Sequence, residues 1–127
     1  MKKSTVVAAL SALAQESRLD IFRLLVQKGP EGLPAGEIGE RLGLPPPTLS
    51  FHLNQLRFAG LVRSQRESRS IIYSANFRAM NELLAYLTEN CCGGRPELCA
   101  PDACALMTPP AIAPSAVGQR KNAGRKR

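Results

Sequence analysis

Apolar residues recur three and four positions apart in several segments of residues 1–90, which is the spacing of helices with one buried face. The predicted helices span residues 4–14, 17–28, 35–42, 46–59 and 77–90. Between the last two, the runs LVRSQRE and SIIYSAN are rich in strand-forming residues and are joined by a short polar turn near Ser68. These runs predict a β-hairpin.

Local signals mark where the helices begin and end. Ser17 is the predicted N-cap of the second helix. Gly43 is placed to end the third helix, and the PPP run at 45–47 is tolerated only at the start of the fourth. Apolar spacing predicts a set of core-facing side chains, namely Val6, Ala9, Leu10, Leu13, Ile38, Leu42, Leu49, Leu53 and Leu56.

The first segment has a second interpretation. Lys2 and Lys3 followed by VVAALSALA resemble a signal peptide with a small-residue end. The amphipathic helix is favoured because the apolar stretch is short and Ser11 interrupts it.

The order helix, helix, helix–turn–helix, hairpin, helix predicts a mainly α fold with a β-hairpin wing, the winged helix–turn–helix. Residues 35–59 form the expected helix–turn–helix, with the fourth helix as its recognition element. Polar groups on this helix are candidates to read base edges: Thr48, Ser50, His52, Asn54 and Gln55. Candidates for phosphate contacts are Arg57 on the helix and Arg63, Arg66 and Arg69 on the hairpin.

Each of these candidates has a structural alternative. Exposed polar and arginine side chains are often only solvated. Phe51 fits either core packing or a thymine-methyl contact, and a lone histidine such as His52 is more often a structural hydrogen-bonding group.

Charge and composition agree with a polyanionic partner. The net charge is +7, and a basic surface favours nucleic acid or an acidic membrane. Residues 1–90 carry 11 basic and 8 acidic side chains, a net of +3, and residues 91–127 carry 6 and 2, a net of +4. Much of the excess is therefore in the tail. No apolar run is long enough to span a membrane, so we expect a cytoplasmic protein with reduced thiols. No catalytic triad, acid/base pair or phosphate loop is present, and no enzymatic activity is predicted.

The four cysteines of the chain are Cys91, Cys92, Cys99 and Cys104. Soft thiolates favour soft ions, and trivalent arsenic or antimony is held by three of them. Zinc prefers four ligands, and four cysteines are present, but the paired C-x-x-C spacing typical of zinc sites is missing. An oxidised disulfide is a further alternative, joining one of the adjacent pair to Cys99 or Cys104 because bonding between neighbours is strained.

The stretch LPPPTLSFHLNQLRFAGLV at 44–62 resembles the ArsR family of metal-responsive repressors, as do LAQESRLDIFRLL and the wing ending in IIYSA. The resemblance covers about residues 4–90. It implies a homodimer, built from the first and last helices, that binds an operator palindrome until an inducer releases it. It also implies that Thr48, Ser50, Phe51 and His52 contact bases, although Pro46 and Pro47 replace residues that are usually polar.

The run YLTENCC at 86–92 is similar to that of arsenic-responsive members with a vicinal cysteine pair at the end of the last helix. This likeness implies Cys91, Cys92 and Cys99 as ligands, with Cys104 as a substitute or spare. We therefore predict a repressor induced by As(III), with Sb(III) or methylated trivalent arsenic as other inducers. The alternatives are a redox, zinc or other soft-metal regulator, or a metal carrier.

The chain is expected to divide into three parts. Residues 1–92 form the DNA-binding and dimerisation domain, and residues 91–104 form the metalloid-binding segment. Residues 105–127 form a basic tail whose composition is typical of disorder.

Overall fold

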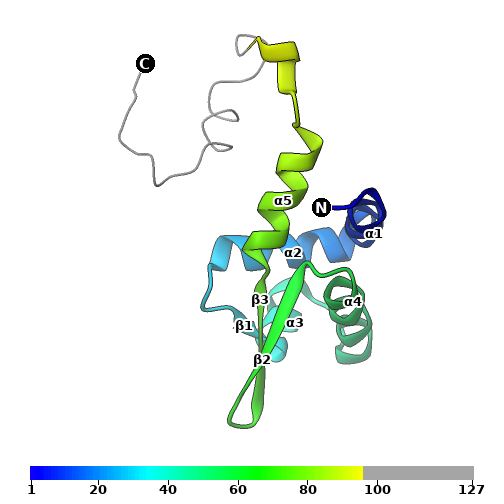
Figure 1. The fold of residues 1–127 in the computed structure, drawn as a ribbon. Helices are drawn as coiled ribbons and strands as arrows, with labels where there is room; N and C mark the ends of the chain where they lie inside the picture. The colour runs from blue at the N-terminus through cyan, green and yellow to red at the C-terminus, as the bar shows by residue number, and fades with distance from the viewer. Residues whose placement is uncertain (96–127) are drawn as a thin grey trace. The chain divides into compact units, whose positions relative to one another are not determined.

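A computed structural model describes residues 1–95 and confirms the winged helix–turn–helix, mainly α with a hairpin wing (Figure 1). The elements follow the predicted order, with one additional short strand. Their bounds are α1 Lys3–Leu13, α2 Glu16–Lys28, β1 Leu33–Pro34, α3 Ala35–Leu42, α4 Pro46–Phe58, β2 Val62–Glu67, β3 Ser70–Ala75, α5 Phe77–Leu87 and the 3₁₀ turn η1 Cys91–Gly94. One compact unit comprises Met1–Tyr86, and a second begins at Leu87. Cys99, Cys104 and the predicted basic tail 105–127 lie outside the described residues.

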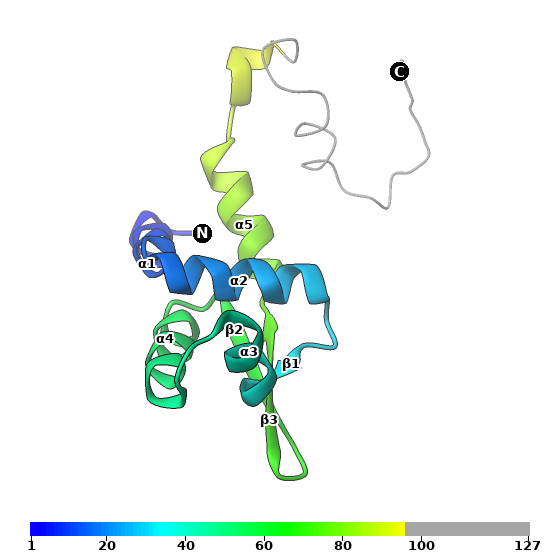
Figure 2. The same cartoon turned by 180° about the vertical axis from the view of Figure 1, so that it is seen from behind.

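Helix α2 lies at the centre of the first unit. It packs against α1, α3, α4 and β3 (Figure 2). Its buried side chains are Ile21, Phe22 and Leu25. The prediction of Ser17 as its N-cap is wrong, because the helix begins one residue earlier. Gln15 is the cap, and its side-chain oxygen accepts the backbone N–H of Arg18 at 2.9 Å.

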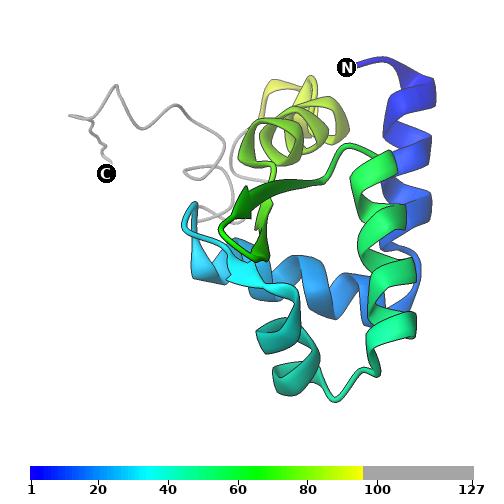
Figure 3. The same cartoon turned by 90° about the horizontal axis from the view of Figure 1, so that it is seen from below.

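The helix–turn–helix is built as predicted. Leu49, Leu53 and Leu56 of α4 are buried. Gly43 ends α3 in the left-handed conformation, with φ 68°, where a glycine has no steric penalty. Figure 3 shows α4 running alongside α1. The leucine face of the recognition helix is therefore fixed to the domain, and its opposite face is free of the core.

The core face of α1 differs from the predicted one. Val6, Ala9 and Ala12 are buried, whereas Leu10 is 41% exposed. Neighbouring faces of this helix are both apolar, so spacing alone could not choose between them. The small Ala9 and Ala12 are on the buried face of α1, which packs against α2 and α4.

The sequence pattern did not predict the short strand β1. β1 pairs antiparallel with β3, with Leu33 opposite Tyr73 and Pro34 opposite Ile72. The sheet order is β1-β3-β2. Two residues are too few to show strand alternation, which explains why the pattern missed β1. The hairpin turn lies where predicted, and Ser68 takes a left-handed φ of 54° there in place of a glycine.

Gly32 is required where β1 meets β3. Its φ is +72°, and a Cβ at this position would collide with the Tyr73 carbonyl oxygen and lie 2.9 Å from Cγ2 of Ile72. Replacing Gly32 with alanine is therefore expected to destabilise the domain by about 1–3 kcal/mol. Thermal unfolding followed by circular dichroism measures this loss. Gly36→Ala is the matched control, because nothing lies within 4 Å of its added Cβ, and its melting temperature should be unchanged or higher.

The last helix is shorter than predicted. α5 ends at Leu87, not at residue 90, and Asn90 has a left-handed φ of 58°. Such a conformation interrupts a helix. Cys91 and Cys92 therefore lie in the separate turn η1, where the Cys91 N–H donates to the Thr88 carbonyl at 2.8 Å. Within residues 1–95, no helix is both long and apolar enough to cross a membrane.

Candidate nucleic-acid interface and thiol segment

The exposed face of α4 carries most of the residues predicted to contact DNA. Thr48, Ser50, Asn54 and Arg57 are exposed, and Gln55 is half-buried. Phe51 is 56% exposed, so core packing is excluded for its side chain. The structure thus gathers these groups on one surface of the recognition helix.

His52 is the exception, and its predicted base contact is corrected. The ring is only 8% exposed and faces the core with the leucines. Arg18 donates from Nη1 to His52 Nδ1 at 3.3 Å and from Nε to the Ala12 carbonyl at 2.7 Å. An arginine only donates, so Nδ1 accepts and the neutral ring carries its proton on Nε2. Arg18, which the sequence analysis did not single out, therefore links α1, α2 and α4.

Burial lowers the pKa of His52 below its usual value of 6.5, and the charge of Arg18 lowers it further. Between the lowered folded-state pKa and 6.5, the unfolded chain binds more protons than the folded one. Stability therefore falls as the pH drops through this window. Melting curves between about pH 7.5 and pH 5.5 should show this loss, and His52→Gln should reduce it. If the melting temperature falls equally with pH in the wild-type protein and in the variant, His52 is not the group that causes the loss.

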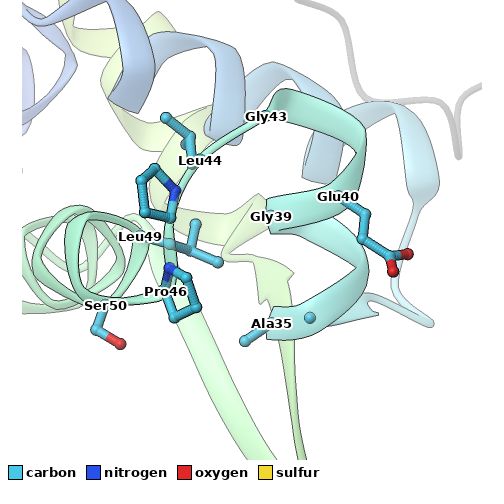
Figure 4. A pocket seen from close by; sticks show the side chains of 10 residues that line it. Ala35, Gly39, Glu40, Gly43, Leu44, Pro46, Leu49 and Ser50 are labelled. Carbon is cyan, nitrogen blue, oxygen red and sulfur yellow. The ribbon is translucent and has the colours of Figure 1, made fainter.

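The start of α4 offers apolar contacts rather than hydrogen bonds. Pro45 is the N-cap without a side-chain cap, and Pro46 and Pro47 occupy the first two positions. Both lack the backbone N–H that a helix start usually presents to a phosphate. A hollow of about 460 Å³ lies beside them between α3 and α4, lined by Ala35, Gly36, Gly39, Glu40, Gly43, Leu44, Pro45, Pro46, Leu49 and Ser50. In Figure 4, Pro46 and Leu49 lie between the two helices at this hollow.

The arginines of the wing do not share one face. Arg57 at the end of α4 donates from Nη1 to Ser64 Oγ of β2 at 3.5 Å. Side chains two apart on a strand point the same way and adjacent ones point oppositely, so Arg66 shares the face of Ser64 and Arg63 lies on the other. Arg69 follows Ser68 in the turn. Arg57 and Arg66 therefore form one cationic side of the wing, next to α4.

Asn76 connects the recognition helix to α5. Its Nδ2 donates to the Gly60 carbonyl at 2.9 Å, just beyond α4, and its Oδ1 accepts the Ala79 N–H at 3.2 Å in the first turn of α5. Asparagine before an apolar helix is a known capping signal, so this residue could have been found from the sequence.

The described thiols lie close together. Cys91 Sγ and Cys92 Sγ are 3.1 Å apart. Cys91 is exposed and Cys92 is half-buried. Cys92 is disulfide-bonded in this structure, so it must be reduced before its thiolate can bind an ion. Among residues 1–95, no three His, Cys, Asp or Glu side chains are grouped to hold a metal ion. Any three-thiolate site would draw on Cys99 or Cys104.

Comparison with known proteins agrees with this geometry. A family model described as a helix–turn–helix domain matches residues 13–65. The transcriptional activator HlyU of Vibrio cholerae is 40% identical over 81 residues, which span 61% of this chain and 72% of HlyU.

Two solved structures match about two thirds of the chain. An ArsR-like transcriptional regulator from Rhodococcus sp. RHA1 is 28% identical with a TM-score of 0.59, covering 66% of this chain and 76% of its own. A homodimeric winged helix–turn–helix DNA-binding domain from Mycobacterium bovis is 28% identical with a TM-score of 0.57, covering 66% and 75%. The chain belongs to the ArsR-like family of winged helix–turn–helix transcriptional regulators.

Proposed function

We propose that this protein is an As(III)-responsive transcriptional repressor. It binds operator DNA as a homodimer in the cytoplasm and is released when three cysteines bind the metalloid. Cys91, Cys92 and Cys99 are the proposed ligands, with Cys104 as a substitute. The adjacent sulfurs of Cys91 and Cys92, 3.1 Å apart, are the observation that carries the metalloid part.

The chemistry of this pair fits the proposed inducer. Once Cys92 is reduced, two thiolates so close can bind one thiophilic ion together, and sulfur ligands select such ions over hard cations. Bound there, the ion would supply strong bonds to sulfur that cross-link the segment. As(III) is the main candidate. Sb(III) would use the same pair of cysteines. Methylated trivalent arsenic, which needs only two sulfur ligands, would use it as well.

Exposed apolar side chains support a dimer built from the first and last helices. Val7 is 55% exposed and Leu10 41% on α1, and Leu84 is 38% and Leu87 54% on α5. Large apolar groups left on a surface favour association. The M. bovis relative is described as homodimeric, which is the arrangement we propose here.

Helix α5 is the element through which we propose that ion binding at the cysteines changes DNA binding. Leu83 of this helix is buried in the core, and Asn76 at its start bonds to the carbonyl that follows α4. Reorganisation of the chain after Leu87 is therefore proposed to shift α5, the dimer contact and the spacing of the two recognition helices. A coupling of this kind amounts to about 1–3 kcal/mol.

The two faces of the wing give a sharp test of the DNA-binding half. We expect Arg66→Gln to weaken operator binding and to lower the slope of log K against log salt by about 0.9 for each phosphate that is no longer neutralised. Arg63→Gln is the matched control on the opposite face and should change both quantities less. Fluorescence anisotropy on the chain's own upstream DNA over a salt series measures them. Equal effects of the two variants would contradict the assignment of faces.

A redox regulator is the second candidate, because Cys92 is disulfide-bonded in this structure. In that case oxidation of the thiols, rather than an ion, would release the operator. Titrating the reduced protein on its operator with arsenite, and separately with peroxide, distinguishes the two.

A further inference from the structure

One line of side chains on α4 points away from the buried leucines. Residues 47, 51, 54 and 58 are four, three and four positions apart, so they lie on one face of the helix. Phe51 is 56% exposed and Phe58 is 77% exposed, and Pro47 and Asn54 are exposed too. We call Pro47, Phe51, Asn54 and Phe58 the outer ridge. It is apolar except for Asn54, which is unusual for a surface that faces water.

The residues of the outer ridge in the first turns of α4, Pro47, Phe51 and Asn54, have the chemistry to select among bases. The C5-methyl of thymine is the apolar group that a base pair presents in the major groove, whereas guanine is read most often by Arg or Lys. Residues 46–56 contain neither Arg nor Lys, so the first turns of α4 lack the usual guanine reader. Asn54 instead matches adenine, which accepts and donates at N7 and N6. An adenine is paired with a thymine, so Asn54 and its apolar neighbours favour the same base pair.

Phe51 is held in place for such a contact. It lies in the second turn of α4, and helix–turn–helix proteins contact bases with the first turns of the recognition helix. Its ring meets His52 edge-on, with centroids 5.7 Å apart and planes at 62°. His52 is in turn buried and bonded to Arg18. Pro47, at the second position of α4, is fixed by its own ring.

We propose that Pro47 and Phe51 pack against thymine methyl groups and that Asn54 reads an adenine, so that each operator half-site presents A·T pairs to the start of α4. Arg57 lies on the same helix, and Arg66 lies on the face of β2 that carries Ser64, the partner of Arg57. These cations fit phosphates next to the contacted bases, which favours DNA over a protein as the occupant. The inference rests on the proposed operator binding and specifies its base preference.

The test replaces each thymine of the operator half-site with deoxyuridine, which removes only the methyl group. Anisotropy with the reduced wild-type protein should show a loss of affinity of about fourfold for each methyl that packs against Pro47 or Phe51. Phe51→Ala should bind the thymine and uracil probes equally at the position that it contacts. Phe58→Ala is the matched control, the same residue type on the same face but in the last turn, and should keep the discrimination.

Three results would overturn the inference. If every uracil probe binds the wild-type protein as tightly as the parent DNA does, the methyl contact is wrong while operator binding stands. If Phe51→Ala leaves the thymine-to-uracil ratio unchanged, the role of Phe51 is wrong, and a protein becomes the better occupant of the ridge. The absence of specific binding to any upstream fragment would remove the proposed function together with this inference.

Discussion

Replacing Cys91 with serine is expected to abolish the response to arsenite while leaving operator binding intact. The hydroxyl of serine is a hard donor and is a poor ligand for a thiophilic ion. Cys91 lies in η1, outside α4 and the wing, so the apo affinity for DNA should not change. The wild-type affinity should fall by about 5–150-fold with saturating arsenite, and that of the variant should stay constant. Anisotropy of the reduced proteins measures both.

The other cysteines refine this result. Cys92→Ser and Cys99→Ser should behave as Cys91→Ser does. Cys104→Ser is the matched control from the same segment, and it should keep the response if Cys104 is a spare. An unchanged response in all three predicted ligand variants would refute the proposed site.

Replacing Leu56 with alanine is expected to destabilise the domain by about 2–5 kcal/mol. Leu56 is 0% exposed, so truncation of its side chain leaves a cavity where α4 meets the core. This is a large share of the roughly 5–15 kcal/mol that stabilises a typical domain. Denaturant unfolding measures it, and DNA binding should weaken as the domain unfolds.

Phe58→Ala on the same helix is the control for this change. Phe58 is 77% exposed, so its truncation leaves no cavity in the core and should cost less than about 0.5 kcal/mol. A similar loss of stability in both variants would show that α4 is not packed through its leucine face.

The sequence predicted the features of the fold that follow from the regular spacing of apolar residues along a helix. Leu49, Leu53 and Leu56 recur at helical spacing over three turns, and the glycine at 43 has a specific backbone role. The buried position of His52 follows from the same spacing, since it lies three residues after Leu49 and four before Leu56. A histidine is polar, so the sequence suggested that the side chain of His52 is exposed. Its burial depends on Arg18, a hydrogen-bond partner that is distant in sequence.

The remaining differences depend on contacts between elements. Leu10 and Ala12 of α1 are both apolar, and only packing against α2 and α4 decides that the alanine faces inward. β1 exists because β3 lies beside it, not because of its own two residues. α5 ends three residues before the left-handed Asn90, and periodicity reveals neither feature. The arginines of the wing were all identified, but their division between two faces required the strand register.

The ligand set of the thiol site stays a prediction, and the geometry of its described pair was not predicted. Cys91 and Cys92 were expected at the end of the last helix, and they lie in a separate turn with close sulfurs instead. Adjacent cysteines in a sequence do not determine how the backbone orients their side chains. The left-handed conformations of Asn90 and Cys92 are the local features that set this arrangement.

The proposed function depends above all on the release of this protein from its operator by As(III). We would measure the anisotropy of the reduced wild-type protein on its own upstream DNA during titration with arsenite, and in parallel with zinc and with peroxide. We expect release by arsenite at concentrations where zinc has no effect. Tight operator binding that ignores arsenite and is lost with peroxide or zinc would contradict it.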